Sequence, residues 1–197
     1  MTGILHENRT PEYWDHQYRQ GATWRPVDER EQILFRTHTD PDPVWRAVDI
    51  GCGLGEMTQA LWWMGMQVQG YDFSKVAVSV ARNSAWHTGA TFEVHDFDTE
   101  SNPPEVTPGS LDLVVCRLSL EFLDRERLLA DARRWLAPEG IVHITTSVAE
   151  KEPATSRHRG LPESVVHDMG RGAFRSRTRY DLDDDGTVTC LVLRGPM

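Results

Sequence analysis

The chain has 197 residues, 39% hydrophobic and 26% charged, which is typical of a folded globular protein. Thirty acidic against 21 basic side chains give a net charge of −9, which argues against nucleic-acid binding by counterion release. The sequence contains no run of ~18 apolar residues, no secretory signal and no metal-binding pair among its three cysteines, so we expect a cytoplasmic protein without a metal site.

Predicted helices and strands alternate along most of the chain. Residues 1–46 are polar and rich in aromatic side chains, and we expect them to form a helical cap. Short apolar runs predict strands at 47–50, 66–72, 91–97, 111–120 and 140–147. Amphipathic or capped segments predict helices at 55–65, 74–88 and 124–140, the last stopped by Pro138 and Gly140.

This alternation predicts an α/β fold. Strands separated by helices of ~10–15 residues indicate βαβ units and a doubly wound, Rossmann-like, mostly parallel sheet. Alternating runs on either side of Asp185-Gly186 predict that the sheet ends in an antiparallel hairpin. We therefore expect one domain over 1–197, with the cap at 1–46, a core at 47–146 and a substrate-side segment with the final hairpin at 147–197.

Glycines and acidic residues follow three successive strands, where ligands bind in open α/β sheets. The loop Gly51-Cys52-Gly53-Leu54-Gly55 leaves room for a ligand against the backbone. Asp72 ends the second strand, the position at which nucleotide-binding folds carry an acidic residue that binds the ribose. Asp96 ends the third strand, beside Phe97. Glu56 stands where a dinucleotide-binding loop needs a small residue, and its charge would repel a pyrophosphate. The pattern therefore predicts a nucleoside ligand without phosphate.

These motifs resemble those of class I S-adenosylmethionine-dependent methyltransferases. VDIGCGLGEMT resembles the first motif of that family, GYDFS the second, EVHDF the third, LDLVVCRLSLEFL the fourth, and LAPEGIVHITT the segment around the fifth strand. The opening YWDHQYRQGATW is similar to the cap of thiopurine and tellurite-resistance methyltransferases.

The resemblance implies S-adenosyl-L-methionine as cofactor and S-adenosyl-L-homocysteine as product. By the same resemblance, Asp49 holds the cofactor amino group, Asp72 the ribose diol and Asp96 the adenine amine, while Phe73 and Phe97 sandwich the base. The full set of expected cofactor contacts is Trp14, Tyr18, Trp24, Asp49, Gly51, Cys52, Gly53, Gly55, Asp72, Phe73, Asp96, Phe97 and Arg117.

Methyl transfer needs in-line geometry and exclusion of water, and a base only if the nucleophile must lose a proton. Glu121, just beyond the fourth strand, is the candidate base or amine-orienting group. We expect a small-molecule acceptor, because no insertion is long enough for a separate substrate domain. The scarcity of lysine, typical of GC-rich genomes, suggests specialised metabolism.

A basic segment near the C-terminus leaves the chemical class of the methyl acceptor undecided. Residues 151–180 carry seven basic and three acidic side chains, and its arginines are Arg157, Arg159, Arg171, Arg175, Arg177 and Arg179. Three roles for these arginines stay open: they form a solvated face, they bind an anionic substrate, or they bind RNA. The alternative functions are accordingly an RNA methyltransferase, or a cofactor-binding protein of this fold that does not methylate. Monomer and homodimer are both compatible with the sequence, and we expect no membrane partner.

Overall fold

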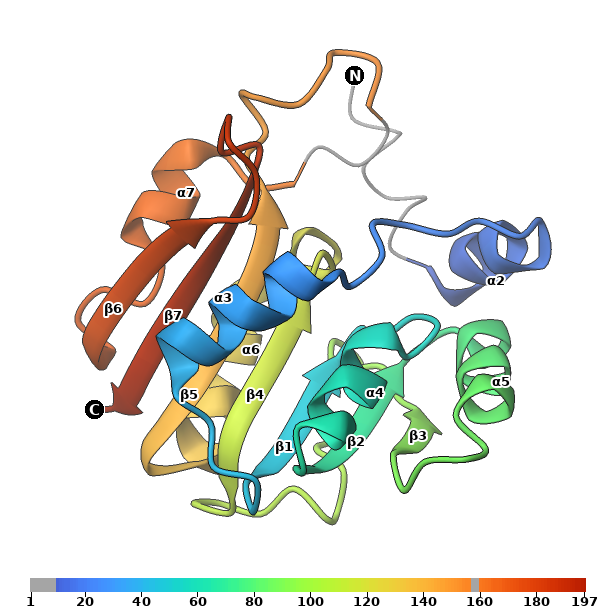
Figure 1. Cartoon of the computed structure of the whole chain (residues 1–197), viewed down its shortest axis with the longest axis horizontal. Coiled ribbons are helices and arrows are strands. Elements are labelled where there is room, and N and C mark those ends of the chain that lie inside the picture. The colour runs from blue at the N-terminus through green and yellow to red at the C-terminus, as the bar shows by residue number, and fades with distance from the viewer. Residues whose placement is uncertain (1–9, 157–159) are drawn as a thin grey trace.

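A computed structural model describes residues 10–156 and 160–197. Seven strands form one sheet in the order β3-β2-β1-β4-β5-β7-β6 (Figure 1). The strands are β1 Arg46–Ile50, β2 Gln67–Asp72, β3 Thr91–Val94, β4 Leu111–Arg117, β5 Leu136–Ser147, β6 Phe174–Asp181 and β7 Val188–Pro196. The first five strands are parallel, and β7 runs antiparallel to both β5 and β6. This confirms the predicted α/β fold with its antiparallel end.

Helices cover both faces of the sheet (Figure 1). On the near face lie α3 and α4, while α6 lies behind the sheet and α2 stands beside α5. The helices are α2 Pro11–Arg19, α3 Glu29–Thr39, α4 Glu56–Trp63, α5 Lys75–Ser84, α6 Arg125–Trp135 and α7 Glu163–Asp168, with the 3-10 turn η1 at Leu120–Phe122. In the described residues, no helix has the length and apolar character needed to cross a membrane.

The continuous apolar character of the central strands follows from this two-sided cover. Along β1, Val48 and Ile50 belong to the core cluster that includes α6, whereas Ala47 belongs to the cluster that includes α3 and α4. Along β4, Val114 and Leu113 divide between the two clusters in the same way. Because successive side chains of a strand point to opposite faces, both faces of each central strand must be apolar.

The structure moves several predicted boundaries. The strands expected over 91–97 and 111–120 end at Val94 and Arg117. The helix expected over 124–140 ends at Trp135, and β5 begins at once with Leu136 rather than after Pro138 and Gly140. Pairing between β5 and β7 starts only at Ile141, so Pro138 removes no hydrogen bond from that ladder. The helix expected over 74–88 ends at Ser84, and Ser74 caps its first turn as predicted, accepting a hydrogen bond from the Ala77 amide.

Candidate functional site

A cavity opens at the carboxyl ends of β1, β2 and β4, roofed by α2 and by residues 20–28, which join α2 to α3. Of the predicted cofactor residues, these line it: Trp14, Tyr18, Trp24, Asp49, Gly51, Cys52, Gly53, Asp72, Phe73, Asp96, Phe97 and Arg117. We call this space the main cavity. It lies where parallel sheets bind ligands, as expected.

Glycines of the loop after β1 serve two different purposes. Gly51 has a φ of 68°, and a Cβ there would lie 2.5 Å from the Ser119 Cβ, so no side chain fits where the loop meets the end of β4. Gly55 does not line the main cavity. With a φ of 83°, it packs against β3, where a Cβ would lie 2.6 Å from the Phe92 Cε1. The structure therefore gives Gly55 a packing role at the start of α4, and its predicted cofactor contact remains a prediction.

Two buried carboxylates line the main cavity. Asp49 Oδ2 accepts a hydrogen bond from Thr58 Oγ1 at 2.6 Å, while its buried Oδ1 has no hydrogen-bond partner among the described residues. Asp72 accepts from the amides of Gly53, at 2.9 Å, and Ser74, at 2.8 Å. Burial raises the pKa of both carboxyl groups to about 6. The unsatisfied Oδ1 of Asp49 fits an ammonium donor such as the amino group of the expected cofactor.

The residues after β3 also border the main cavity. Asp96 Oδ1 accepts from the Asp98 amide at 3.0 Å and Oδ2 from Thr99 Oγ1 at 2.7 Å, so this carboxylate stabilises the turn that follows the strand. Phe97 packs edge-on against Tyr71 on the side of the sheet that α6 covers. The predicted adenine contacts of Asp96 and Phe97 remain predictions, and the structure adds a local structural role for the carboxylate.

Aromatic rings from three segments form the roof. The ring centroid of Trp14 lies 4.9 Å from that of Trp24 and 4.9 Å from that of Phe122, and Tyr18 lies 5.3 Å from Trp24. Burial and the nearby Asp72 raise the pKa of Tyr18, which keeps its hydroxyl protonated near neutral pH. These rings exclude water, and an aromatic face attracts a desolvated cation.

A contact that sequence reasoning missed places α2 over the main cavity. Asp15 Oδ1 accepts hydrogen bonds from Ser74 Oγ at 2.6 Å and from the Val76 amide at 3.2 Å, at the first turn of α5. A carboxylate at a helix N-terminus is favoured by the unpaired amides and the helix dipole. Asp15 lies on the same helix as Trp14 and Tyr18, so this contact holds both rings in the roof.

Arg117, at the end of β4, forms a buried ion pair that the sequence did not predict. Its Nε and Nη2 donate to the two carboxylate oxygens of Glu31 on α3, at 2.7 and 2.8 Å. Nη2 also donates to the carbonyl of Arg25 at 2.9 Å. Burial disfavours the charged guanidinium, but the hydrogen bonds and charge of Glu31 outweigh this effect and raise the pKa of Arg117. Glu31 is only 2% exposed. It lies outside the motifs of the sequence and meets Arg117 only in the folded chain, so no local pattern marks it as functional.

A second cavity adjoins the first and contains Glu121. Trp24, Arg25, Leu118 and Phe122 line both cavities, and Glu121 and Glu152 line the second. The sharp turn at Leu118, with a φ of 53°, lies between β4 and the 3-10 turn that carries Glu121. Glu121 Oε2 accepts a hydrogen bond from the Gly160 amide. Glu121 therefore lies beside the main cavity rather than in it.

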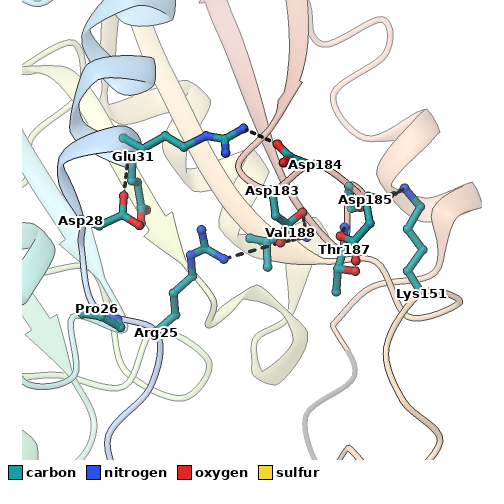
Figure 2. Close-up of polar contacts among 12 residues, drawn as sticks. Arg25, Pro26, Asp28, Glu31, Lys151, Asp183, Asp184, Asp185, Thr187 and Val188 are labelled. Atoms are coloured by element: carbon teal, nitrogen blue, oxygen red, sulfur yellow. Dashed lines mark hydrogen bonds and ion pairs between the residues drawn. The ribbon is translucent and has the colours of Figure 1, made fainter.

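Arg25 at this junction is held from the opposite end of the chain. Its Nη1 lies 3.5 Å from the Asp183 carboxylate in the β6–β7 turn, and Asp183 also accepts from the Val188 amide (Figure 2). Arg30 pairs with Asp184 at 3.0 Å in the same turn. These contacts fix residues 20–28 over both cavities.

The arginines of β6 lie elsewhere. Arg175 pairs with Glu139, Arg177 donates to the Val166 carbonyl at 2.8 Å, and Arg179 pairs with Glu163 of α7. None of the three lines either cavity. Arg171 pairs with Asp168 at 3.4 Å, while Arg157 and Arg159 fall outside the described residues. In the parts of the chain that the structure describes, no group of three or more His, Cys, Asp or Glu side chains is arranged to hold a metal ion.

The chain is similar in sequence to known methyltransferases. Residues 48–144 match the family described as Methyltransferase domain. The chain is 31% identical over 140 residues to the ubiquinone biosynthesis O-methyltransferase of Paraburkholderia xenovorans, covering 68% of this chain and 57% of that protein. The corresponding Thiobacillus denitrificans protein is 29% identical over 137 residues, with the same coverage. The chain thus spans less than two thirds of these relatives.

Solved structures share the fold at lower identity. Phosphoethanolamine N-methyltransferase 2 of Haemonchus contortus superposes with a TM-score of 0.70 at 16% identity, covering 95% of this chain and 58% of that one. A TehB-like SAM-dependent methyltransferase of Corynebacterium glutamicum gives a TM-score of 0.64 at 19% identity, covering 98% of each chain.

Proposed function

The chain belongs to the class I S-adenosylmethionine-dependent methyltransferases, and on that premise we propose that it transfers the cofactor's methyl group to a small-molecule acceptor. The observation that carries this proposal is the main cavity, where the residues expected to hold a nucleoside cofactor converge from four strand ends and α2. The buried, unsatisfied Oδ1 of Asp49 supports an ammonium ligand there. When bound, the cofactor supplies a methyl group already activated by its sulfonium.

In the proposed mechanism the protein mainly binds and orients the reactants and excludes water from them. Asp49 accepts a hydrogen bond from the amino group of the cofactor, and Asp72 accepts from the ribose hydroxyls. Phe73 and Phe97 enclose the adenine beside Asp96. Trp14, Tyr18 and Trp24 would exclude water from the main cavity when the cofactor is bound, and a low-dielectric space of this kind favours methyl transfer.

We place the acceptor in the second cavity, because it adjoins the main cavity and shares residues with it. In this proposal the Glu121 carboxylate would orient the acceptor and would accept the proton that the acceptor's nucleophile loses. An anionic group on the acceptor would meet Arg25 rather than the arginines of β6, because Arg25 lines both cavities even though its Nη1 lies 3.5 Å from the Asp183 carboxylate. Phosphoethanolamine and geranyl diphosphate, named with two structural neighbours, are anionic small molecules of this kind.

Neither alternative function gains support from the site. The β6 arginines expected to contact RNA are engaged by Glu139, Glu163 and a backbone carbonyl. A cofactor-binding protein that does not methylate has no need of a second cavity beside the first, so the second cavity favours transfer to an acceptor.

Calorimetric titration with S-adenosylhomocysteine tests the cofactor assignment. We expect wild type to bind it and Asp72→Ala to bind at least about tenfold more weakly, because the ribose hydroxyls lose their charged acceptor. NADH is the matched control ligand and should not bind. Binding of NADH without binding of S-adenosylhomocysteine would overturn the proposal.

A further inference from the structure

Arg117 presents an electrostatic problem for a cavity that binds a cation. Its guanidinium is mostly buried and lines the main cavity at the end of β4. On the proposed function, the same cavity takes a cofactor whose reactive centre is a sulfonium. Like charges in a poorly solvated space repel each other strongly, and salt screens buried charges little. An uncompensated Arg117 would therefore favour the product, which has lost the sulfonium charge, over the substrate.

Glu31 removes this repulsion. It reaches Arg117 from α3, outside the motif-bearing core, and both of its oxygens accept hydrogen bonds from the guanidinium. With 2% exposure for Glu31, the pair is shielded from solvent, so its net charge of zero is what the cavity experiences.

We propose that Glu31 is a positioning residue that sets the preference of the main cavity for a cationic ligand, by neutralising Arg117. The inference rests on the proposed function and deepens it. Glu31 acts through Arg117 and need not touch the cofactor. It allows the substrate to bind despite an arginine in the wall of the cavity, and it limits the advantage of the uncharged thioether product.

A purely structural role for the pair makes a different prediction. Arg117 also donates to the carbonyls of Arg25 and Pro26, so it holds residues 20–28 in place. If support of this segment were the whole role, loss of the Glu31 charge would weaken all ligands of the cavity equally. If charge compensation is the role, cationic ligands lose more affinity than neutral ones.

The test compares ligand affinities by calorimetry. S-adenosylmethionine and sinefungin, which carries a protonated amine in place of the sulfonium, are the cationic ligands, and S-adenosylhomocysteine is the neutral one. We expect Glu31→Gln to lower affinity for both cations about tenfold more than for S-adenosylhomocysteine. Glu29→Gln, at an exposed position of the same helix, is the control and should leave the affinity ratio unchanged.

Two further variants keep the test decisive if Glu31→Gln folds poorly. Arg117→Met leaves the Glu31 carboxylate without its cationic partner and should shift the affinity ratio in favour of the cationic ligands. Arg117→Met combined with Glu31→Leu removes both charges, avoids an unpaired buried ion and should restore the wild-type ratio. Equal changes for all three ligands in every folded variant would overturn the role of Glu31 while leaving the proposed function intact. Absence of binding by wild type would instead overturn the proposed function.

Discussion

Asp49 and Asp72 combine burial with charge, and this combination links stability to binding. Each carboxyl group has a pKa raised to about 6 from 3.8, mainly by desolvation. The folded protein therefore holds these protons more tightly than the unfolded chain. The stability contributed by each protonated carboxyl group is fully present below pH 3.8 and is lost as the pH rises through about 6. At neutral pH the unliganded protein thus carries two costly charges in its cavity.

Asp49→Asn should separate the effect of the buried charge on stability from its effect on ligand binding. The free energy of unfolding of the variant relative to wild type should increase by about 2–3 kcal/mol between pH 4 and pH 7, because only the wild type ionises a buried carboxyl group at position 49. Urea denaturation at several pH values measures this difference, with Asp42→Asn at an exposed position as the control. In the same variant, affinity for S-adenosylhomocysteine should fall about tenfold or more. A stability difference between variant and wild type that does not change between pH 4 and pH 7 would contradict the argument.

The predicted helices and strands exist, but their boundaries and contacts depend on neighbours. Periodicity located β1, β2 and β4 closely, because central strands covered on two faces are apolar throughout. The start of β5 was misplaced, because Pro138 and Gly140 are tolerated there only where β7 has not yet joined the sheet. The docking of α2 through Asp15 had no local signal, since Ser74 lies 59 positions away.

Asp15→Ala tests the docking of α2. Loss of the contacts with Ser74 and the Val76 amide should loosen the helix and its two roof rings, so that S-adenosylhomocysteine binds about tenfold more weakly. The sheet should keep its stability, with a shift of a few degrees at most in the thermal midpoint. Glu12→Ala, at an exposed position of α2, is the matched control for affinity and thermal midpoint. Wild-type affinity in Asp15→Ala would show that the roof does not depend on this contact.

Segments far apart in the chain meet at the β6–β7 turn (Figure 2). Asp183 joins Arg25 across 158 positions, and Lys151 Nζ donates to the carbonyls of Asp185 and Gly186 at 2.8 and 3.0 Å. Arginines of the basic segment pair with acidic residues nearby, as Arg179 does with Glu163. Among the described residues of the segment, Arg171, Arg175, Arg177 and Arg179 thus contact neighbouring groups of the fold and do not line either cavity.

Asp183→Ala should lower the free energy of unfolding by about 1–2 kcal/mol, because it removes both the acceptor for the Val188 amide and the partner of Arg25. Asp184→Ala is the control. Its side chain is 93% exposed, and loss of its ion pair with Arg30 should change stability by less than about 0.5 kcal/mol. Denaturant unfolding of both variants measures the difference, and equal effects would show that the contacts of the half-buried Asp183 add no stability beyond those of the exposed Asp184.

The amino-acid sequence was sufficient for the fold class, the order of the first five strands and most of the residues around the main cavity. These features depend on short-range patterns, namely apolar runs, glycines in a tight loop and carboxylates directly after strands. Tertiary structure alone decided the pairing of Arg117 with Glu31, the docking of Asp15, the second cavity beside Glu121 and the use of the basic segment. Each of these depends on side chains that are far apart in the chain and meet only when the sheet and its helices pack, so no local periodicity records them.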